Sequence, residues 1–302
     1  MSTPHTGGLT MQEIRLGAVN MTNDEYHAAP GVSKSHLDLI AQKSPRHYWH
    51  RYLNPNREPV EKTTFMKRGT ATHIAILQPD ELEKLVVCGL DIDRRSKENK
   101  EKWAAFEKAN ADKTIVTKEQ WENILPLRDY VWKHSEASRL LTNIIAEQSI
   151  FGMMDVPDGE GGVVTNEETG EVQQALVKCQ PDAIARDFSY LLDLKSTDDA
   201  NQMVFGRKAG NYRYPVQPAW YSAVMDCALG RSPEVACFLV FEPEPPYALG
   251  IYYLEPVDMM TGFQAAMRDF AMIERHRRLN WWPDYAELNK AQPLKLGKYV
   301  KL

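Results

Sequence analysis

The sequence predicts a mixed α/β protein, in which a helical N-terminal region precedes a central mixed sheet that helices flank. Two observations carry this prediction. Between residues 33 and 147 apolar side chains recur mostly at helical spacing, whereas between 149 and 254 short apolar runs are separated by turn signals. The 302 residues are 43% hydrophobic and 25% charged, which is the composition of a chain with a buried core rather than of a disordered one.

Helices are expected through most of the first half of the chain. One begins at Ser33 or Ser35, since either side chain can cap a helix, and a shorter one follows Pro45 and ends near Asn54. Residues 1–20 show no clear periodicity and are expected to form a loose arm. Further helical spacing covers residues 64–77, 94–113 and 117–147, with at least one break in the last segment.

Strands are expected from residue 149 onwards. A hairpin is expected around the proline-rich turn at 243–246, and an amphipathic helix around Phe263 closes the pattern. The expected strands cover 149–156, 172–179, 190–195, 235–241 and 249–254, with a helix at 217–229.

The domain organisation follows from this division of the chain. We expect a single domain over residues 21–286, followed by a basic tail at 287–302. Within the domain, residues 21–147 are the mainly helical part and residues 148–286 the α/β core.

The charge of the chain is segregated. The net charge of −5 by itself argues against a nucleic-acid partner, because binding to a polyanion requires clustered Lys and Arg. Residues 33–70, however, carry eight Lys or Arg and three Asp or Glu, whereas residues 152–175 carry six acids and no base. Residues 288–302 carry four lysines and no acid. A polyanion could therefore bind at the basic N-terminal segment.

Several classes of protein are disfavoured. No uninterrupted apolar run reaches the roughly 18 residues of a membrane span, and the first residues lack the pattern of a secretory signal, so a cytoplasmic protein without a membrane partner is expected. The four cysteines form no CxxC pair, which disfavours zinc ribbons and disulfide scaffolds. The absence of a GxxxxGK[ST] sequence excludes an ATP-driven motor of that type.

Asp182, Asp193 and Lys195 form the clearest chemical pattern. Asp193 and Lys195 are two apart on an expected strand, so both side chains leave the same face, and a neighbouring strand that ends at Asp182 can bring a second carboxylate beside the first. Close carboxylates repel each other, and a divalent cation such as Mg²⁺ resolves that conflict, while Lys195 orients or deprotonates a water. The alternative is a surface ion pair, because DxK is a common tripeptide. The apolar run 190–192 instead favours a buried strand.

The ordered motifs of the chain resemble the PD-(D/E)xK nuclease superfamily, through Pro181-Asp182 and the Asp193-Leu194-Lys195 tripeptide. More narrowly, they resemble the RecE (exodeoxyribonuclease VIII) group of phage and prophage recombination exonucleases. The resemblance covers roughly residues 20–280. It also rests on residues 23–27 (NDEYH), 30–35 (PGVSKS), 44–45 (SP), 68–73 (RGTATH) and 217–221 (QPAWY), the last of which matches the QxxxY motif of RecB-like nucleases.

This resemblance implies a restriction-endonuclease-like (PD-(D/E)xK) core and a Mg²⁺-dependent 5′→3′ exonuclease. Such an enzyme degrades double-stranded DNA from its ends and leaves 3′ single strands, and Mn²⁺ is expected to replace Mg²⁺. The resemblance further implies a ring-shaped homo-oligomer and a RecT-like annealing protein as partner. The metal would be held by His73, Asp182, Asp193 and the Leu194 carbonyl, while Lys195 positions the water.

Four side chains have roles that the sequence leaves open. His73 lies among apolar residues, so it is either a core histidine or, as the resemblance implies, a metal ligand. Gln217 and Tyr221 lie four apart on one helical face. They are either ordinary polar residues or catalytic residues that face the DxK strand and fix Lys195 or a phosphate. Glu147 is either a solvated residue or a further acid at the metal site.

The basic segment is expected to contact DNA. It interleaves Lys and Arg with Tyr48, Trp49 and Tyr52, and the N-terminus of its first helix is a candidate anion site. The alternative is a solvated helix face with buried aromatic residues. The expected DNA-binding residues are Ser33, Lys34, Ser35, Arg46, Arg51 and Arg68.

Two other functions remain open. One is a structure-specific or single-strand DNA endonuclease on the same fold, which would cut closed circular single-stranded DNA. The other is a catalytically silent DNA-binding or assembly protein, which the joint presence of Asp182, Asp193 and Lys195 disfavours.

Overall fold

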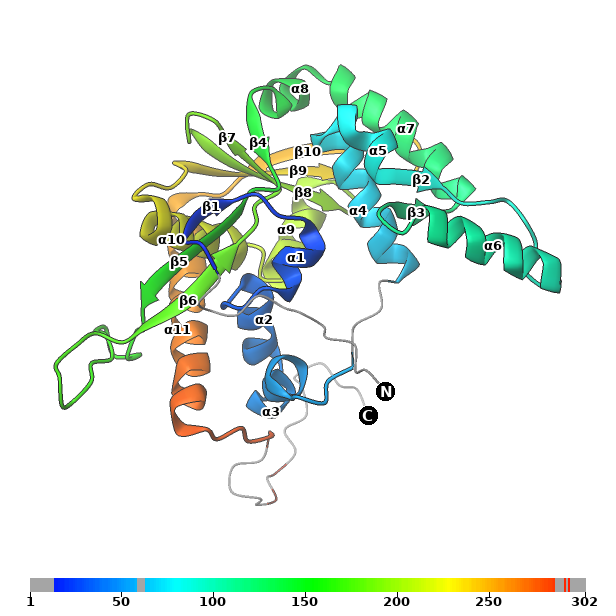
Figure 1. Cartoon of the computed structure of the whole chain (residues 1–302). Helices are drawn as coiled ribbons and strands as arrows, with labels where there is room; N and C mark the ends of the chain where they lie inside the picture. The colour runs from blue at the N-terminus through cyan, green and yellow to red at the C-terminus, as the bar shows by residue number, and fades with distance from the viewer. Residues whose placement is uncertain (1–13, 59–62, 286–290, 292, 294–302) are drawn as a thin grey trace.

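The central element of the protein is a five-stranded mixed sheet (Figure 1). The computed structural model describes residues 14–58, 63–285, 291 and 293. The strand order is β10-β9-β8-β7-β4, in which β8 and β9 run parallel and the other neighbours antiparallel, so the predicted mixed sheet is confirmed. The strands are β4 (Ile144–Ala146), β7 (Ala183–Ala185), β8 (Tyr190–Ser196), β9 (Val235–Phe241) and β10 (Leu249–Tyr253).

Strand β8 is covered on both faces. Its residues 191–194 are all buried. Leu192 and Leu194 pack with residues of α4 (Thr64–Leu77) and α7 (Lys118–Lys133). Leu191 belongs instead to the cluster with residues of α10 (Val216–Leu229) and α11 (Pro256–Leu279). The apolar run before Asp193 therefore marks a buried strand, and this strand carries the carboxylate into the protein interior.

A second sheet has three antiparallel strands, in the order β1-β5-β6. Two of its strands confirm the expected strands at 149–156 and 172–179, but they pair in this sheet and not with β8. The strands are β1 (Gly17–Val19), β5 (Ser149–Asp155) and β6 (Gln174–Cys179).

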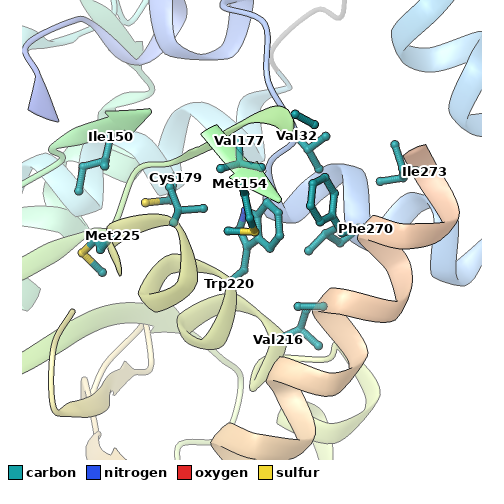
Figure 2. Close-up of a cluster of buried hydrophobic side chains, with 14 of the residues drawn as sticks. Val32, Ile150, Met154, Val177, Cys179, Val216, Trp220, Met225, Phe270 and Ile273 are labelled. Carbon is teal, nitrogen blue, oxygen red and sulfur yellow. The ribbon is translucent and has the colours of Figure 1, made fainter. Parts of the chain in front are cut away.

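Helix α10 (Val216–Leu229) covers this second sheet, and α11 (Pro256–Leu279) packs against α10 and α2. Trp220 of α10 is fully buried in a cluster with Val177 of β6 and Phe270 of α11 (Figure 2). Its indole N–H donates to the carbonyl of Lys178 at 3.2 Å, so this large side chain buries its apolar surface without leaving its polar atom unpaired.

The N-terminal helices from α2 onwards follow the predicted order, whereas α1 was not predicted. Ser33 precedes α2, and its hydroxyl lies 2.8 Å from His36 Nδ1. The helix that begins at Pro45 continues into a π-helical turn, which ends before Asn54 as predicted. The elements are α1 (Asn23–Ala28), α2 (Lys34–Gln42), α3 (Pro45–Tyr48) and the π-helix Trp49–Leu53.

The middle of the chain adds further helices and a small parallel pair of strands. The helix predicted at 64–77 is confirmed as α4. Gly89, which follows β2, lies close to the Trp103 ring, and a Cβ there would meet this ring at 2.7 Å. The elements are a 3₁₀ helix (Pro79–Glu81), α5 (Leu82–Leu85), β2 (Val86–Cys88), α6 (Lys97–Ala109), β3 (Thr114–Val116), α7 (Lys118–Lys133) and α8 (Ser135–Leu141).

Two predictions about the start and middle of the chain are wrong. Residues 17–19, expected in a loose arm, form β1 and pair with β5. Residues 144–146, expected in a helix, form β4 and pair with β7. In both cases only three residues are involved, which is too few for apolar periodicity to distinguish a strand from a helix. Strands β2, β3 and β7 and helix α9 (Gln202–Asn211) were not predicted.

The expected domain division also needs a correction in detail. Residue 147 separates the predicted helical part from the α/β core, but β4 lies before that boundary and belongs to the central sheet. Most of the predicted basic tail, 287–302, lies outside the described residues. None of the helices in the described part of the chain is both long and apolar enough to span a bilayer.

Candidate active site

Strand pairing brings two acids at the ends of β4 and β7 close to a third, Asp193, in the middle of β8. Glu147 follows β4 and Asp182 precedes β7, and the pairing of Ala146 with Ala183 places these two acids side by side. The Glu147 N–H donates to the Asp182 carbonyl at 3.1 Å. Asp182 therefore lies directly before a strand, whereas the sequence pattern predicts it at the end of one. The pairing of β7 with β8 still brings it beside Asp193, as predicted.

His73, Glu147 and Asp182 form a group that could hold a metal ion. One ligand atom from each lies within 4.8 Å of the others. Nδ1 of His73 is 3.6 Å from an Asp182 carboxylate oxygen and 4.0 Å from a Glu147 carboxylate oxygen. Carboxylate oxygens and an imidazole nitrogen are a donor set that suits a divalent cation. Asp193 is not a member of this group.

The backbone of Leu194 faces the same group. Its N–H donates to Asp182 Oδ2 at 2.7 Å. The N–H and C=O of one strand residue point to the same edge of the strand, so the Leu194 carbonyl lies on the edge of β8 that Asp182 occupies. This placement is consistent with the predicted carbonyl ligand.

Charge in this group favours a cation. Burial and the neighbouring Asp182 raise the pKa of Glu147 to about 8, against the opposing effect of His73. Burial lowers the pKa of His73, but Asp182 and Glu147 outweigh burial and raise it to about 9. The two carboxylates thus stabilise a positive charge beside them, which a proton on His73 or a divalent cation supplies.

Asp193, Lys195, Gln217 and Tyr221 form a connected network next to this group. Asp193 is only 2% exposed and forms an ion pair with Lys195. Lys195 Nζ donates to Gln217 Oε1 at 3.1 Å, and Gln217 Nε2 contacts both Asp193 Oδ1 and, at 3.2 Å, the Tyr221 hydroxyl. The Gln217 amide therefore fixes both members of the ion pair, and the four side chains that the sequence singled out do lie together.

Lys195 keeps its proton in this network. Burial opposes the charge on Lys195, but Asp193 and Asp182 outweigh burial and raise the lysine pKa above its ordinary value. Burial also raises the pKa of Asp193, to about 6, although Lys195 opposes the shift. A lysine with a raised pKa donates hydrogen bonds and does not act as a base, which favours orientation of a water over its deprotonation.

A cavity of about 950 Å³ opens onto these groups. His73, Leu194 and Lys195 line one part of it, and Arg68 of α4 lines another. The volume is in the range of pockets that hold small organic ligands.

The family of the chain agrees with this geometry. A family model described as "PDDEXK-like domain of unknown function (DUF3799)" matches residues 33–293. The chain belongs to this family. Its mixed sheet, in which Asp182 before β7 lies beside Asp193 of β8, is the core of a PD-(D/E)xK nuclease fold.

Solved structures extend the comparison of this PDDEXK-like protein. It is similar to a "Putative exonuclease" from Eubacterium rectale, with 12% identity, a TM-score of 0.60 and coverage of 92% of this chain and 97% of that chain. It is also matched to SSO0001, with 14% identity over 70% of this chain and 86% of that one, but at a TM-score of 0.29. No curated protein matches the sequence.

The predicted DNA-binding residues of this PDDEXK-like chain occupy two places. Arg68 lines the site cavity, where it contacts Glu244 at 2.5 Å and the Pro243 carbonyl at 3.1 Å. The other five residues are not among those that line it. They lie around α2, α3 and the π-helix, with Arg46 and Arg51 exposed: Ser33, Lys34, Ser35, Arg46 and Arg51.

Some of these predicted contacts are already engaged within the chain. Lys34 pairs with Asp38 at 2.5 Å, and the Ser33 and Ser35 hydroxyls lie 3.0 Å apart. The Tyr52 hydroxyl donates to Ser35 at 3.3 Å. The hydroxyls of Ser33, Ser35 and Tyr52 therefore form a cluster at the start of α2, and the role of this cluster in DNA binding stays a prediction.

Lys208, Tyr212 and Tyr214 are among the residues that line the cavity but were not predicted as site residues. They follow or end α9, a helix that was not predicted. The position of two tyrosines just before Gln217 was the available signal, because aromatic residues next to a catalytic motif have access to its substrate.

Proposed function

We propose that this PDDEXK-like protein is a Mg²⁺-dependent DNA exonuclease that hydrolyses phosphodiester bonds from duplex ends. The observation that carries the proposal is that Lys195 opens onto the same cavity as His73 and the Leu194 edge of the His73–Glu147–Asp182 group. A cation site beside a protonated lysine is an arrangement suited to attack of water on a phosphodiester. The printed name of the structural neighbour from Eubacterium rectale supports the exonuclease assignment.

His73, Glu147, Asp182 and the Leu194 carbonyl would hold the cation, with Asp193 beside them. When bound, a divalent cation polarises a phosphoryl oxygen and stabilises the charge that develops in the transition state. Mn²⁺ is expected to replace Mg²⁺ because it accepts the same oxygen and nitrogen donors.

Lys195 would orient the attacking water through its Nζ hydrogens. Its ion pair with Asp193 and its hydrogen bond to Gln217 limit the positions that Nζ can adopt. Gln217 and Tyr221 act through this network, so they position Lys195 and extend the row of polar groups toward a DNA phosphate.

The finer assignment rests on the motifs that resemble the RecE group. We infer a 5′→3′ direction on double-stranded DNA, 3′ single strands as products, a ring-shaped homo-oligomer and a RecT-like annealing partner in the cytoplasm. The hydroxyl cluster at Ser33 and Ser35, with exposed Arg46 and Arg51, would contact the DNA backbone.

The test is digestion of linear duplexes labelled separately at each 5′ and 3′ end, with Mg²⁺, Mn²⁺ or EDTA. We expect release of the 5′ label first in either metal, and no release in EDTA. Asp193→Asn and Lys195→Ala should abolish the activity, and Lys84→Ala, an exposed lysine on α5, should not. Full activity of either site variant would contradict the proposal.

Closed circular single-stranded DNA separates the exonuclease from an endonuclease. An exonuclease leaves the circle intact, whereas a single-strand or structure-specific endonuclease on this fold converts it to linear products. Binding of duplex ends without cleavage in any divalent metal would instead indicate a DNA-binding or assembly protein.

A further inference from the structure

The turn between α9 and α10 presents two stacked tyrosines to the site cavity. Tyr212 and Tyr214 both line it, and their rings are nearly parallel, at 22°, with centroids 5.8 Å apart. Tyr212 is 59% exposed. An exposed aromatic ring in the wall of a cavity is accessible to a ligand that enters it.

Tyr214 connects Tyr212 to both the core and Lys195. Its ring lies 5.7 Å from that of Phe205 and 6.1 Å from that of Phe238, both of which are buried. Lys195 Nζ lies 4.9 Å from the Tyr214 ring centroid, within the range of a cation–π contact. The aromatic stack therefore runs from the core, past Lys195, to an exposed ring in the cavity.

Arg213 holds this turn in place. Its backbone has φ of 57°, a left-handed conformation that is unfavourable for arginine and requires support from the surroundings. Its side chain pairs with Asp269, which is fully buried, and donates to the Leu37 carbonyl of α2 at 3.3 Å. Tyr212 and Tyr214 flank Arg213, whose side chain is anchored to Asp269 and Leu37, so the turn that carries the two rings is held in place before any ligand binds.

Arg68 and Lys208, the other Arg and Lys of the cavity wall, are already paired. Arg68 is engaged by Glu244, and Lys208 by Asp198 and by the Thr197 hydroxyl at 2.9 Å. Two aromatic side chains of the wall are well exposed, Phe65 at 77% and Tyr212 at 59%, and Tyr212 is the one that stacks on Tyr214 beside Lys195. Nucleobases stack on such rings whatever their sequence, because every base presents a π-face.

We propose that Tyr212 is the stacking platform for the base of the nucleotide next to the cleaved phosphodiester. This inference rests on the proposed nuclease function. Tyr214 supports Tyr212 by stacking on it, and it also contacts Lys195. The ligand is a DNA strand whose terminal base is unpaired, and the cavity of about 950 Å³ has room for one nucleotide.

The test uses oligonucleotides that carry 2-aminopurine at the terminal position, whose fluorescence falls when the base stacks. Binding is measured in Ca²⁺, which generally does not support cleavage in such sites, for wild type, Tyr212→Phe, Tyr212→Leu and the control Tyr253→Leu. Tyr253 is 67% exposed on β10 and does not line this cavity. We expect quenching in all but Tyr212→Leu, which should bind about 5- to 150-fold more weakly, the range for loss of one base–aromatic stack.

A second substrate with an abasic terminal nucleotide makes the test specific for the base. The affinity of wild type should be lower for the abasic substrate than for the normal one, by the same factor by which Tyr212→Leu weakens binding of the normal substrate. The affinity of Tyr212→Leu should be nearly the same for the two substrates. The proposal would be overturned if Tyr212→Leu quenched the fluorescence as wild type does. It would also be overturned if Tyr212→Leu weakened binding of the abasic and the normal substrate by the same factor. Metal-dependent cleavage by wild type is scored separately, so a failed platform leaves the nuclease proposal standing, whereas stacking without cleavage in any metal overturns that proposal alone.

Discussion

Two strand lysines, the buried Lys178 and the partly buried Lys195, occupy opposite kinds of environment. Lys178 of β6 is only 2% exposed, and its ammonium group donates to the carbonyls of Tyr26 at 2.7 Å and Ala29 at 2.5 Å, at the end of α1. Lys195 of β8 pairs instead with Asp193 and with the amide of Gln217 at 3.1 Å. The ammonium group of Lys178 is thus bound by backbone carbonyls, and that of Lys195 by a carboxylate and an amide side chain.

The pKa values of the two lysines diverge for this reason. Burial lowers the pKa of Lys178 to about 8, and carbonyl groups do not reverse the shift. Burial acts on Lys195 as well, but Asp193 and Asp182 outweigh it and raise its pKa. Carboxylates therefore keep the charge on the site lysine, whereas Lys178 serves to join α1 to β6. Lys195 should therefore matter for the reaction and Lys178 for stability.

Replacing Lys195 should give the largest effect. We expect Lys195→Met to reduce the single-turnover rate of duplex cleavage by about 10²- to 10⁴-fold, because the donor that orients the water is lost. Asp193 can respond by taking up a proton, since its pKa is already about 6, so the fold should persist in urea titrations. Cleavage by Lys195→Met at the wild-type rate would show that Lys195 has no role in the reaction.

Replacing Lys178 should act on stability. Lys178→Met leaves two buried carbonyls without a donor, and we expect the free energy of unfolding to fall by about 2–4 kcal/mol. Lys84→Met is the matched control, since Lys84 is exposed and pairs only with Glu81, and its cost should stay below about 0.5 kcal/mol. Urea titration gives both values, and equal stability of the two variants would contradict the structural role of Lys178.

The sequence could predict the Lys195 environment better than that of Lys178. Asp193 and Lys195 lie on one face of one strand, so their proximity follows from a period of two, and the apolar run before them reveals burial. The partners of Lys178 are carbonyls at residues 26 and 29, about 150 residues away in the chain. No local pattern encodes such a contact.

The same distinction explains the outcome for the other site residues. The place of Glu147 beside Asp182 depends on the pairing of β4 with β7, and β4 was taken for helix because three residues cannot show a period. The exposed ring of Tyr212 depends on a left-handed Arg213 anchored to Asp269, which is again a contact between distant segments. These two placements depend on contacts between distant segments, which no pattern within one element encodes.

The pH dependence of stability offers a smaller test of the Lys178 environment. Between about pH 8 and its ordinary pKa of 10.5, Lys178 is neutral in the folded protein and protonated in the unfolded chain. The unfolded state then binds more protons, so the free energy of unfolding rises with pH. Below pH 8 both states are protonated and the cost of burial is fully present.

We therefore expect the stability difference between wild type and Lys178→Met to grow by about 1–3 kcal/mol from pH 7 to pH 10. Urea titrations of both proteins at several pH values measure it, and the subtraction cancels the other titrating groups. The Lys84→Met variant should show no such trend, because Lys84 is exposed. A constant difference across this range would mean that Lys178 titrates in the folded protein as it does in water.

The smallest expected effect is that of the Tyr221 hydroxyl, at the outer end of the Lys195 network. Tyr221→Phe removes one acceptor, at 3.2 Å from Gln217 Nε2, and leaves the contacts of Gln217 with Asp193 and Lys195 in place. Loss of one neutral hydrogen bond corresponds to about 0.5–1.5 kcal/mol, so the cleavage rate should fall by about 2- to 10-fold. Gln217→Leu should cost more, because it breaks the links to both members of the ion pair. If Tyr221→Phe lowers the free energy of unfolding and leaves the rate unchanged, the hydroxyl belongs with the backbone-bound Lys178 as a structural group, and the positioning network ends at Gln217.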